Sequence, residues 1–253
     1  MTYERRYAGV GMERRGQRGA NDSNSAVATY QSILGSNLVA MWHSQLGIAL
    51  VSGKVDTWTD QIGGIVLQAL GAATRPLYQP DGTAFGGNNV VYGTTVDASC
   101  LVNTTIPAGL IPVGSTPWIL DTMRVRAVSV ANIVCAQSAA TFQSAGYINA
   151  ANDMRLSVIG ADRVTLSPFN NAVRNYSFYI DGTNANINNN GVITSGVYAG
   201  TTTAVVAKFA VNANAAGGAA GDLSHALVLV CRTPPTAGQE AAVRALATAE
   251  FPP

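Results

Sequence analysis

Charged side chains are scarce in this chain. Only 11% of its 253 residues are Asp, Glu, Lys or Arg, against about a quarter in an average soluble domain. A free monomer normally relies on a surface of mixed charges to resist association. The composition therefore predicts that other subunits cover much of the surface, in a homo-oligomer or in a larger assembly.

Glutamate is especially rare. The chain holds Glu4, Glu13, Glu240 and Glu250, and no glutamate lies between residues 14 and 239. A retaining glycosidase works with two carboxyl groups about 5 Å apart, and this long central region offers no glutamate for such a pair. Most aspartates stand beside Gly, Thr or Asn, as turn and capping residues do. We predict no catalytic residue and no enzymatic activity, with an all-aspartate site as the alternative.

Histidine and cysteine are also rare. His43 and His225 are the two imidazoles, no Gly-x-Ser-x-Gly elbow accompanies them, and we expect both to be structural residues hydrogen-bonded to backbone. The cysteines, Cys100, Cys135 and Cys231, are scattered through apolar runs without the spacing of a zinc site. We predict three buried free thiols, with one disulfide bridge as the alternative, and neither a metal nor a cofactor.

We expect neither a secretory signal nor a membrane segment. Charges run throughout its first residues, which therefore lack the apolar core of a signal peptide. No run approaches 18 apolar residues. We expect a protein that is made in the cytoplasm, stays unprocessed and has no membrane partner.

Basic residues are concentrated at the start of the chain. Residues 1–19 carry five arginines and two glutamates, a formal +3, whereas residues 20–253 carry ten basic and twelve acidic side chains, a formal −2. Interleaved glycines leave this arm without periodicity, so alone it should be disordered. We predict that it docks on a partner through bidentate arginine contacts; a solvated tail is the alternative, and without a longer basic face nucleic acid is not expected. The expected assembly residues are Tyr3, Arg5, Arg6, Tyr7, Arg14, Arg15 and Arg18.

The rest of the chain predicts an all-β domain. Residues 1–36 should be the arm and a linker with a short helix over 26–34, and residues 37–253 an antiparallel two-sheet sandwich. A capping box at Thr236 and Gln239 begins a helix over 236–250. In the strand 176–180, the apolar Tyr176, Phe178 and Ile180 share the inward face. The other strands expected are 118–125, 128–136, 154–159, 204–211 and 223–231.

Both ends of this region resemble a known family. They are similar to the ends of laminin-G-like, concanavalin A-like lectin domains. The similarity at the first end lies in Trp42 and Trp58, the turn Asp60-Gln61-Ile62-Gly63-Gly64, Arg75-Pro76 and the strand 89–92. At the other end it lies in Gly221-Asp222-Leu223 and the terminal helix that follows. The resemblance covers about residues 38–251. It implies a jelly-roll sandwich in which the final strand lies beside the first strands and the helix packs against it. Because many such sandwiches bind calcium at a rim, calcium stays open as an alternative.

Two polar segments are predicted to be loops. They are the glycine-rich residues 212–221, which lack the Lys-Ser/Thr end of a phosphate-binding loop, and the asparagine-rich residues 184–190. Amides beside aromatic rings could bind a sugar. The expected glycan-binding residues are Tyr147, Tyr179, Asn186, Asn188 and Tyr198.

Two functions fit these observations. The first is a non-enzymatic structural protein of a virion, such as the capsid decoration or tail-associated protein of a tailed bacteriophage, because lectin-like sandwiches with a docking arm occur in such particles. Its partners would be other virion proteins and further copies of itself. The alternative is a carbohydrate-binding module that attaches to a cell-surface glycan of the host.

Overall fold

The computed structural model describes most of the chain after the arm: residues 20–107, 109–111, 117–127, 130–137, 142–149, 151, 153–159, 161–167, 171–200, 206–213, 216–218 and 220–253. The predicted docking arm lies outside these residues, and with it Tyr3, Arg5, Arg6, Tyr7, Arg14, Arg15 and Arg18. Within the described ranges, no helix is long and apolar enough to cross a membrane.

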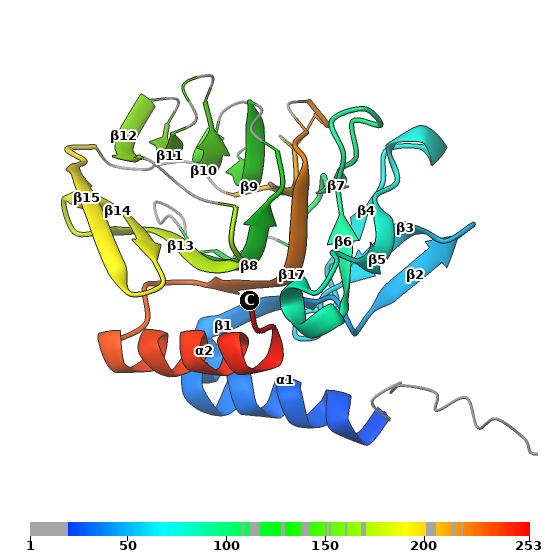
Figure 1. Cartoon of the computed structure of the whole chain (residues 1–253). Helices are drawn as coiled ribbons and strands as arrows, with labels where there is room; N and C mark the ends of the chain where they lie inside the picture. Colours follow the sequence, from blue (N-terminus) through cyan, green and yellow to red (C-terminus); the bar gives the residue numbers. More distant parts are fainter. Residues whose placement is uncertain are drawn as a thin grey trace, which may run out of the picture.

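Antiparallel strands in two facing layers make up most of the structure (Figure 1), which confirms the predicted all-β fold with its C-terminal helix. We call the layer that carries the helices the back sheet and the other layer the front sheet. The back sheet has the order β1 (Leu38–His43), β17 (Leu223–Cys231), β8 (Trp118–Val125), β13 (Arg174–Asp181), β14 (Asn184–Asn189) and β15 (Val192–Val197).

The front sheet is joined to the back sheet along one side. Its order is β2 (Ile48–Val51), β3 (Lys54–Thr59), β4 (Val66–Gln68), β7 (Leu101–Asn103), β16 (Lys208–Val211), β9 (Ala131–Gln137), β10 (Phe142–Ile148), β11 (Met154–Val158) and β12 (Ala161–Leu166). The connecting strands are β5 (Leu77–Pro80), which pairs with β3, and β6 (Asn89–Tyr92), which pairs with β5 and β17.

The two layers nearly close into a barrel on the opposite side. There Gly196 of β15 lies so close to the backbone of Arg163 in β12 that a Cβ atom would overlap the Arg163 carbonyl oxygen. Only glycine permits such a close approach of two backbones. The remaining short elements are 3-10 helices, at Gly35–Asn37, Ala72–Thr74 and Ala84–Gly87.

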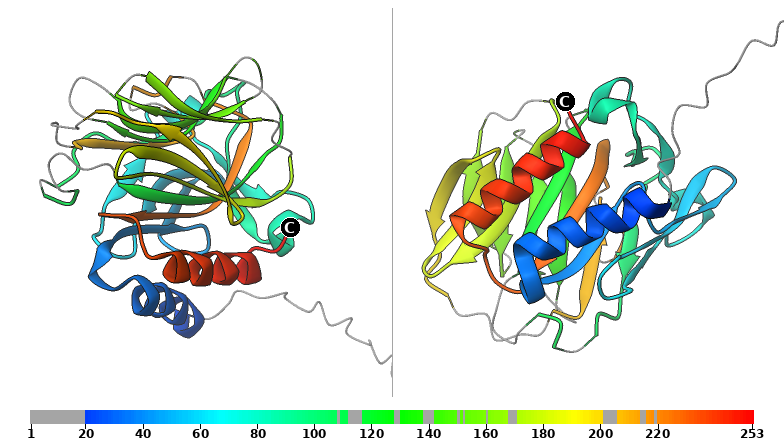
Figure 2. Two further views of the ribbon diagram at one scale, coloured as in Figure 1. Left: turned by 90° about the vertical axis from the view of Figure 1, so that its left-hand side faces the viewer. Right: turned by 90° about the horizontal axis from the view of Figure 1, so that it is seen from below.

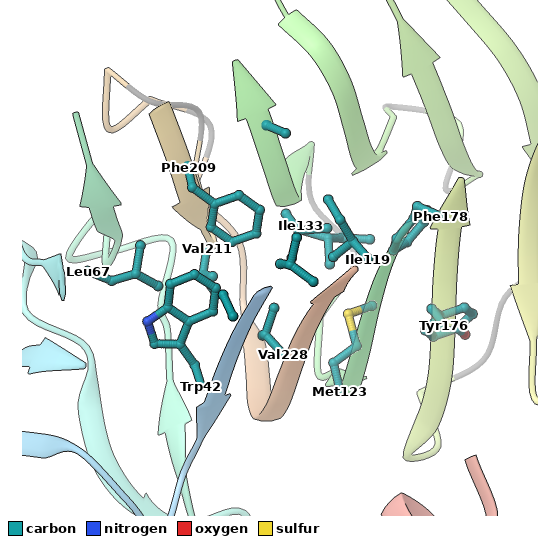
Figure 3. Close-up of a cluster of buried hydrophobic side chains, with 14 of the residues drawn as sticks. Trp42, Leu67, Ile119, Met123, Ile133, Tyr176, Phe178, Phe209, Val211 and Val228 are labelled. Atoms are coloured by element: carbon teal, nitrogen blue, oxygen red, sulfur yellow. The ribbon is translucent and has the colours of Figure 1, made fainter. Parts of the chain in front are cut away.

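The apolar side chains alternate between two packed layers. Trp42 of β1 stacks on Phe209 of β16, with ring centroids 5.2 Å apart, between the two sheets (Figure 3). Tyr176 and Phe178 point into the same core, as predicted, while Trp118 and Leu120 face the helices instead. Period-two alternation thus builds a core on each side of the back sheet.

Two helices cover the outer face of the back sheet. Figure 2 shows α1 (Ala20–Leu34) and α2 (Ala237–Glu250) lying side by side across it. The predicted capping box is present, since Thr236 accepts from the Gln239 backbone N–H and the Gln239 side chain reaches back to Thr236. α1 begins six residues earlier than the predicted start at residue 26, and ends at Leu34 as expected before Gly35, whose φ is +58°.

The asparagine-rich segment is a strand, so the predicted loop is wrong. β14 pairs with β13 and with β15. The two turns that flank it, Asp181-Gly182 and Asn190-Gly191, make a continuous meander of three strands. The amide side chains that suggested a loop find partners outside the ladder, for example between Asn188 and Glu240 of α2, so they do not compete with strand pairing.

The turn after Trp58 is organised by one carboxylate. Asp60 is buried, and its two oxygens accept four backbone N–H groups, from Met41 at 2.7 Å, Ile62 at 2.8 Å, Gly63 at 2.8 Å and Ile65 at 3.0 Å. This aspartate therefore has the turn-forming role predicted for the aspartates. It also ties the turn to β1 through Met41.

Candidate functional site

The outer face of the front sheet carries a polar cluster around Tyr147. In β10, Gly146 lies against the Phe178 ring and Ile148 is buried in the core, so Tyr147 points to the other side of the sheet. Tyr147 stands opposite Arg155 of β11 in the strand register. The third strand adds Asp162 of β12, which accepts a hydrogen bond from the Tyr147 hydroxyl at 2.5 Å.

Arg155 lies between two carboxylates. Its Nη1 is 2.6 Å from Asp162 Oδ2, and its Nη2 is 3.4 Å from Asp153 Oδ2. A hydrogen bond from Ser167, with help from Arg155, lowers the pKa of Asp153, and the hydrogen bond to Asp162 raises the pKa of Arg155. Two carboxylates against one guanidinium leave the cluster with a net negative charge near neutral pH.

The same contacts fix the phenol of Tyr147. Desolvation and the hydrogen bond to Asp162 raise the pKa of Tyr147 to about 12, so the hydroxyl keeps its proton and donates a hydrogen bond to the carboxylate of Asp162. A half-buried aromatic ring beside oriented carboxylates offers one apolar surface and several hydrogen-bond acceptors. Such a combination suits a polyhydroxylated ligand and contains no activated nucleophile.

The other predicted glycan-binding residues do not join this cluster. Tyr179, Asn186 and Asn188 belong to β13 and β14 of the back sheet, where they are buried at 8%, 5% and 1% exposure. Tyr198, also buried, has the guanidinium of Arg163 over its ring at 5.5 Å. The structure therefore divides the five residues among separate places, with Tyr147 alone on the front face.

A second polar network joins α2 to the back sheet. Glu240 Oε1 accepts from Ser177 Oγ at 2.5 Å and from Asn188 Nδ2 at 2.8 Å, and it forms an ion pair with Arg244 Nη1 at 2.9 Å. Glu240 itself is only 5% exposed. Because Ser177, Asn188 and Arg244 all contact the same buried carboxylate, this network holds the helix against the sheet. Its glutamate was visible in the sequence as part of the terminal helix, but its partners were not.

A third cluster joins β1 to both helices. The Tyr30 hydroxyl of α1 donates to Glu250 Oε2 at 3.0 Å, and His43 Nε2 is 3.4 Å from the same oxygen. Burial, followed by the nearby Glu250 charge, raises the pKa of Tyr30. His43 Nδ1 accepts from the Gln45 backbone N–H at 3.1 Å, so its proton lies on Nε2. His43 thus bonds to backbone as predicted, whereas His225 binds the carboxylate of Asp121.

In the described part of the chain, the glutamates and cysteines occupy structural positions. Glu240 and Glu250 both lie on α2, outside the sandwich. Cys100, Cys135 and Cys231 are buried thiols that form no disulfide bridge, as predicted. The described residues contain no group of three His, Cys, Asp or Glu side chains placed to hold a metal ion.

A hollow of about 210 Å³ lies beside the end of α2. Its lining includes Asn175, Asn190, Thr248 and Phe251. Asn175 donates from its side chain to Thr248 Oγ1 at 2.8 Å and from its backbone N–H to Asn190 Oδ1 at 2.7 Å. These polar groups bind one another, so we take the hollow as part of the helix-to-sheet contact.

Comparison with known proteins identifies the fold. No family model matches the sequence, and no curated protein matches it. Among solved structures, Trypanosoma rangeli sialidase is similar at 10% identity and a TM-score of 0.54, over 91% of this chain and 39% of the sialidase. A GH54 α-L-arabinofuranosidase soaked with a cyclic sulfate inhibitor is similar at 11% identity and a TM-score of 0.59, over 88% of this chain and 65% of that enzyme.

These likenesses concern the fold alone. The chain spans about two fifths of the length of the sialidase and about two thirds of the arabinofuranosidase. At such identities the shared feature is the large, curved antiparallel sheet, which is consistent with a concanavalin A-like lectin fold. Fold similarity does not carry an activity from one protein to another.

Proposed function

We propose that this protein is a non-enzymatic attachment module, which docks on a larger assembly through residues 1–19 and displays the front sheet of a lectin-like sandwich. The arm joins the body at Ala20, where α1 begins. α1 is anchored to the back of the sandwich by Tyr30, which is fully buried and bonded to Glu250. The front sheet lies on the other side of the back sheet from the helices (Figure 1).

That opposition of the two sides is the observation that carries the proposal. An arm that leaves from the helix side can bind a partner without covering the outer face of the front sheet. The bound module would then present Tyr147 and its cluster outward. The absence of a glutamate pair from residues 14–239 supports a role without catalysis.

We propose a tailed-bacteriophage virion as the assembly, with the protein as a capsid decoration or tail-associated component. A surface poor in charge supports close packing among neighbours in a particle. Several large apolar side chains are also exposed, including Leu70 at 54%, Val192 at 68% and Val197 at 74%. Exposed apolar groups favour contact with other subunits when they form patches.

Deletion of the arm tests this proposal. The full chain and a variant without residues 1–19 should have the same melting temperature, because the variant keeps the contact between Tyr30 and Glu250 that anchors α1. Incorporation into the parent particle should fall at least tenfold for the deletion variant. A milder variant with Arg14 and Arg15 replaced by Gln should show an intermediate loss. Equal incorporation of all three proteins would refute docking through the arm.

Glycan binding is the second candidate, and the Tyr147 cluster favours it. Both Nη atoms of Arg155 already contact carboxylates, so no guanidinium fork is left for an acidic sugar. The proposed ligand is therefore a neutral glycan, whose hydroxyls donate to Asp153 and Asp162 while its apolar face covers Tyr147.

A glycan array tests the second candidate. The wild-type chain should bind neutral glycans, and Tyr147→Ala or Asp162→Asn should lose at least tenfold in affinity. Thr165→Ala, on the same face of the neighbouring strand, is the matched control and should bind normally. An array without hits would exclude glycan binding and leave the docking proposal standing.

A further inference from the structure

The core of the sandwich contains a buried pair of titratable side chains. Asp121 lies on β8 between Ile119 and Met123, which both face the core, so its carboxyl points inward. His225 lies on the neighbouring β17, and its Nδ1 is 2.8 Å from Asp121 Oδ2. Both side chains are 0% exposed. Among the described residues, Asp121 Oδ1 and His225 Nε2 have no hydrogen-bond partner.

The proton count of this pair follows from its burial. A hydrogen bond between Nδ1 and Oδ2 needs a proton between them. If that were the only proton on the imidazole, the ionised carboxylate would give the pair a net charge of −1. An uncompensated charge inside a protein is far more costly than a neutral pair. With a second proton on the pair, either as the carboxylic acid with a neutral imidazole or as carboxylate with imidazolium, its net charge is zero.

We propose that Asp121 and His225 are held as this net-neutral pair in the folded protein at neutral pH, so that folding takes up one proton and the fold is most stable in mildly acidic solution. Desolvation raises the pKa of Asp121, and His225 opposes that rise only in part. This direction agrees with an extra proton on the pair. The proposal does not depend on the docking arm or on glycan binding.

Among the described residues, other charged groups near the pair do not supply the missing compensation. His225 is the one charged group that acts on the pKa of Asp121, and the side chains that surround Ile119 and Met123 in the core are apolar. Tyr176 stands opposite Asp121 in the register, but burial raises its pKa to about 12, so it stays neutral. Arg124 pairs with Asp81, itself bound by Ser224 on the other face of β17. The remaining titratable side chains on β8 and on the strands around the pair are Arg126, whose guanidinium lies over the ring of Tyr92, together with His43 of β1, Arg174, Tyr179 and Asp181 of β13, and Cys231 of β17.

The sign of the pH effect follows by comparison with the unfolded chain. Above about pH 6.5, free aspartate and histidine side chains hold no dissociable proton beyond the neutral imidazole, whereas the folded pair holds one more. Unfolding then releases a proton, and stability falls as pH rises until the folded pair itself gives up the proton. Between about pH 4 and 6.5 both states hold the same number, so the contribution is level. Below about pH 4 the unfolded chain takes up another proton, and stability falls again.

The Asp121→Asn substitution should change how stability depends on pH. The variant keeps a hydrogen-bonding side chain of the same size but cannot hold the acidic proton. Its buried imidazole stays neutral, so stability should be level above about pH 6.5 and should fall below it. For the wild type, the ratio of folded to unfolded protein should fall by up to about tenfold per pH unit above pH 7 relative to the variant.

Chemical denaturation from pH 4.5 to 8.5 measures this difference, with His43 present in both proteins. Should the variant fail to fold, calorimetry of the wild type in buffers of different ionisation enthalpy still counts the proton released on unfolding at pH 7.5. An uptake of one proton on folding supports the proposal. Parallel stability curves for the two proteins, or no proton released by the wild type, would overturn it.

Discussion

Replacing Glu240 by alanine should lower the free energy of unfolding by weakening the contact between α2 and the back sheet. The change removes a buried carboxylate and leaves Ser177, Asn188 and Arg244 without the group they bind. Breaking a buried ion pair by removal of one partner costs about 3–5 kcal/mol. We take about 3 kcal/mol, because the Arg244 side chain retains 16% exposure and can reach water. In a chain of this size that loss lowers the melting temperature by about 6–12 °C.

Thermal and urea denaturation followed by circular dichroism would measure this loss. Ala241→Gln is the matched control, since Ala241 is exposed on the same helix, and it should change stability by less than about 0.5 kcal/mol. A double-mutant cycle with Arg244→Ala isolates the ion pair, for which we expect a coupling of about 1 kcal/mol or more. If Glu240→Ala were no more destabilising than the control, the network would not be what holds α2.

Three further predictions follow from other contacts. Tyr30→Phe removes the hydrogen bond to Glu250, so the free energy of unfolding should fall by about 1–2 kcal/mol. The denaturation midpoint should fall accordingly with an unchanged m-value, and an unaltered midpoint would contradict the contact. Gly196→Ala forces a Cβ atom against β12 and should cost about 1–3 kcal/mol, whereas Gly71→Ala, which meets no atom within 4 Å, should be tolerated. Burial raises the pKa of Cys231 to about 12, so iodoacetamide at pH 8 should modify it only after unfolding; rapid labelling of the folded protein would refute its burial.

Local sequence patterns were sufficient to predict the strands and the helix whose own residues favour the structure they adopt. β8 and β17 have the predicted bounds, and both consist mainly of apolar residues that are buried in the structure. α2 follows its capping box at Thr236. β14 was missed because its asparagines have weak strand propensity by themselves. Their burial depends on α2, whose Glu240 is 52 residues away in the chain.

The clusters depend on contacts that no local pattern contains. Tyr147 was predicted as a binding residue, but Arg155 and Asp162 were not, because the three meet only when β10, β11 and β12 pair. The buried pair is even harder to predict from the sequence, since Asp121 and His225 are 104 residues apart in the chain. Spacing can predict which face a residue occupies, but not which distant strand brings a partner to that face.

The central claim is that the arm side of the protein is bound in the assembly while the front sheet stays exposed. Cysteine labelling tests it directly, because the native thiols are buried. One variant carries Gly16→Cys in the arm, and the other carries Thr165→Cys, at an exposed position of β12. On the assembled particle, a maleimide should label the Thr165→Cys protein at its free rate and the Gly16→Cys protein at least tenfold more slowly. Protection of Thr165→Cys with free labelling of Gly16→Cys would contradict the account.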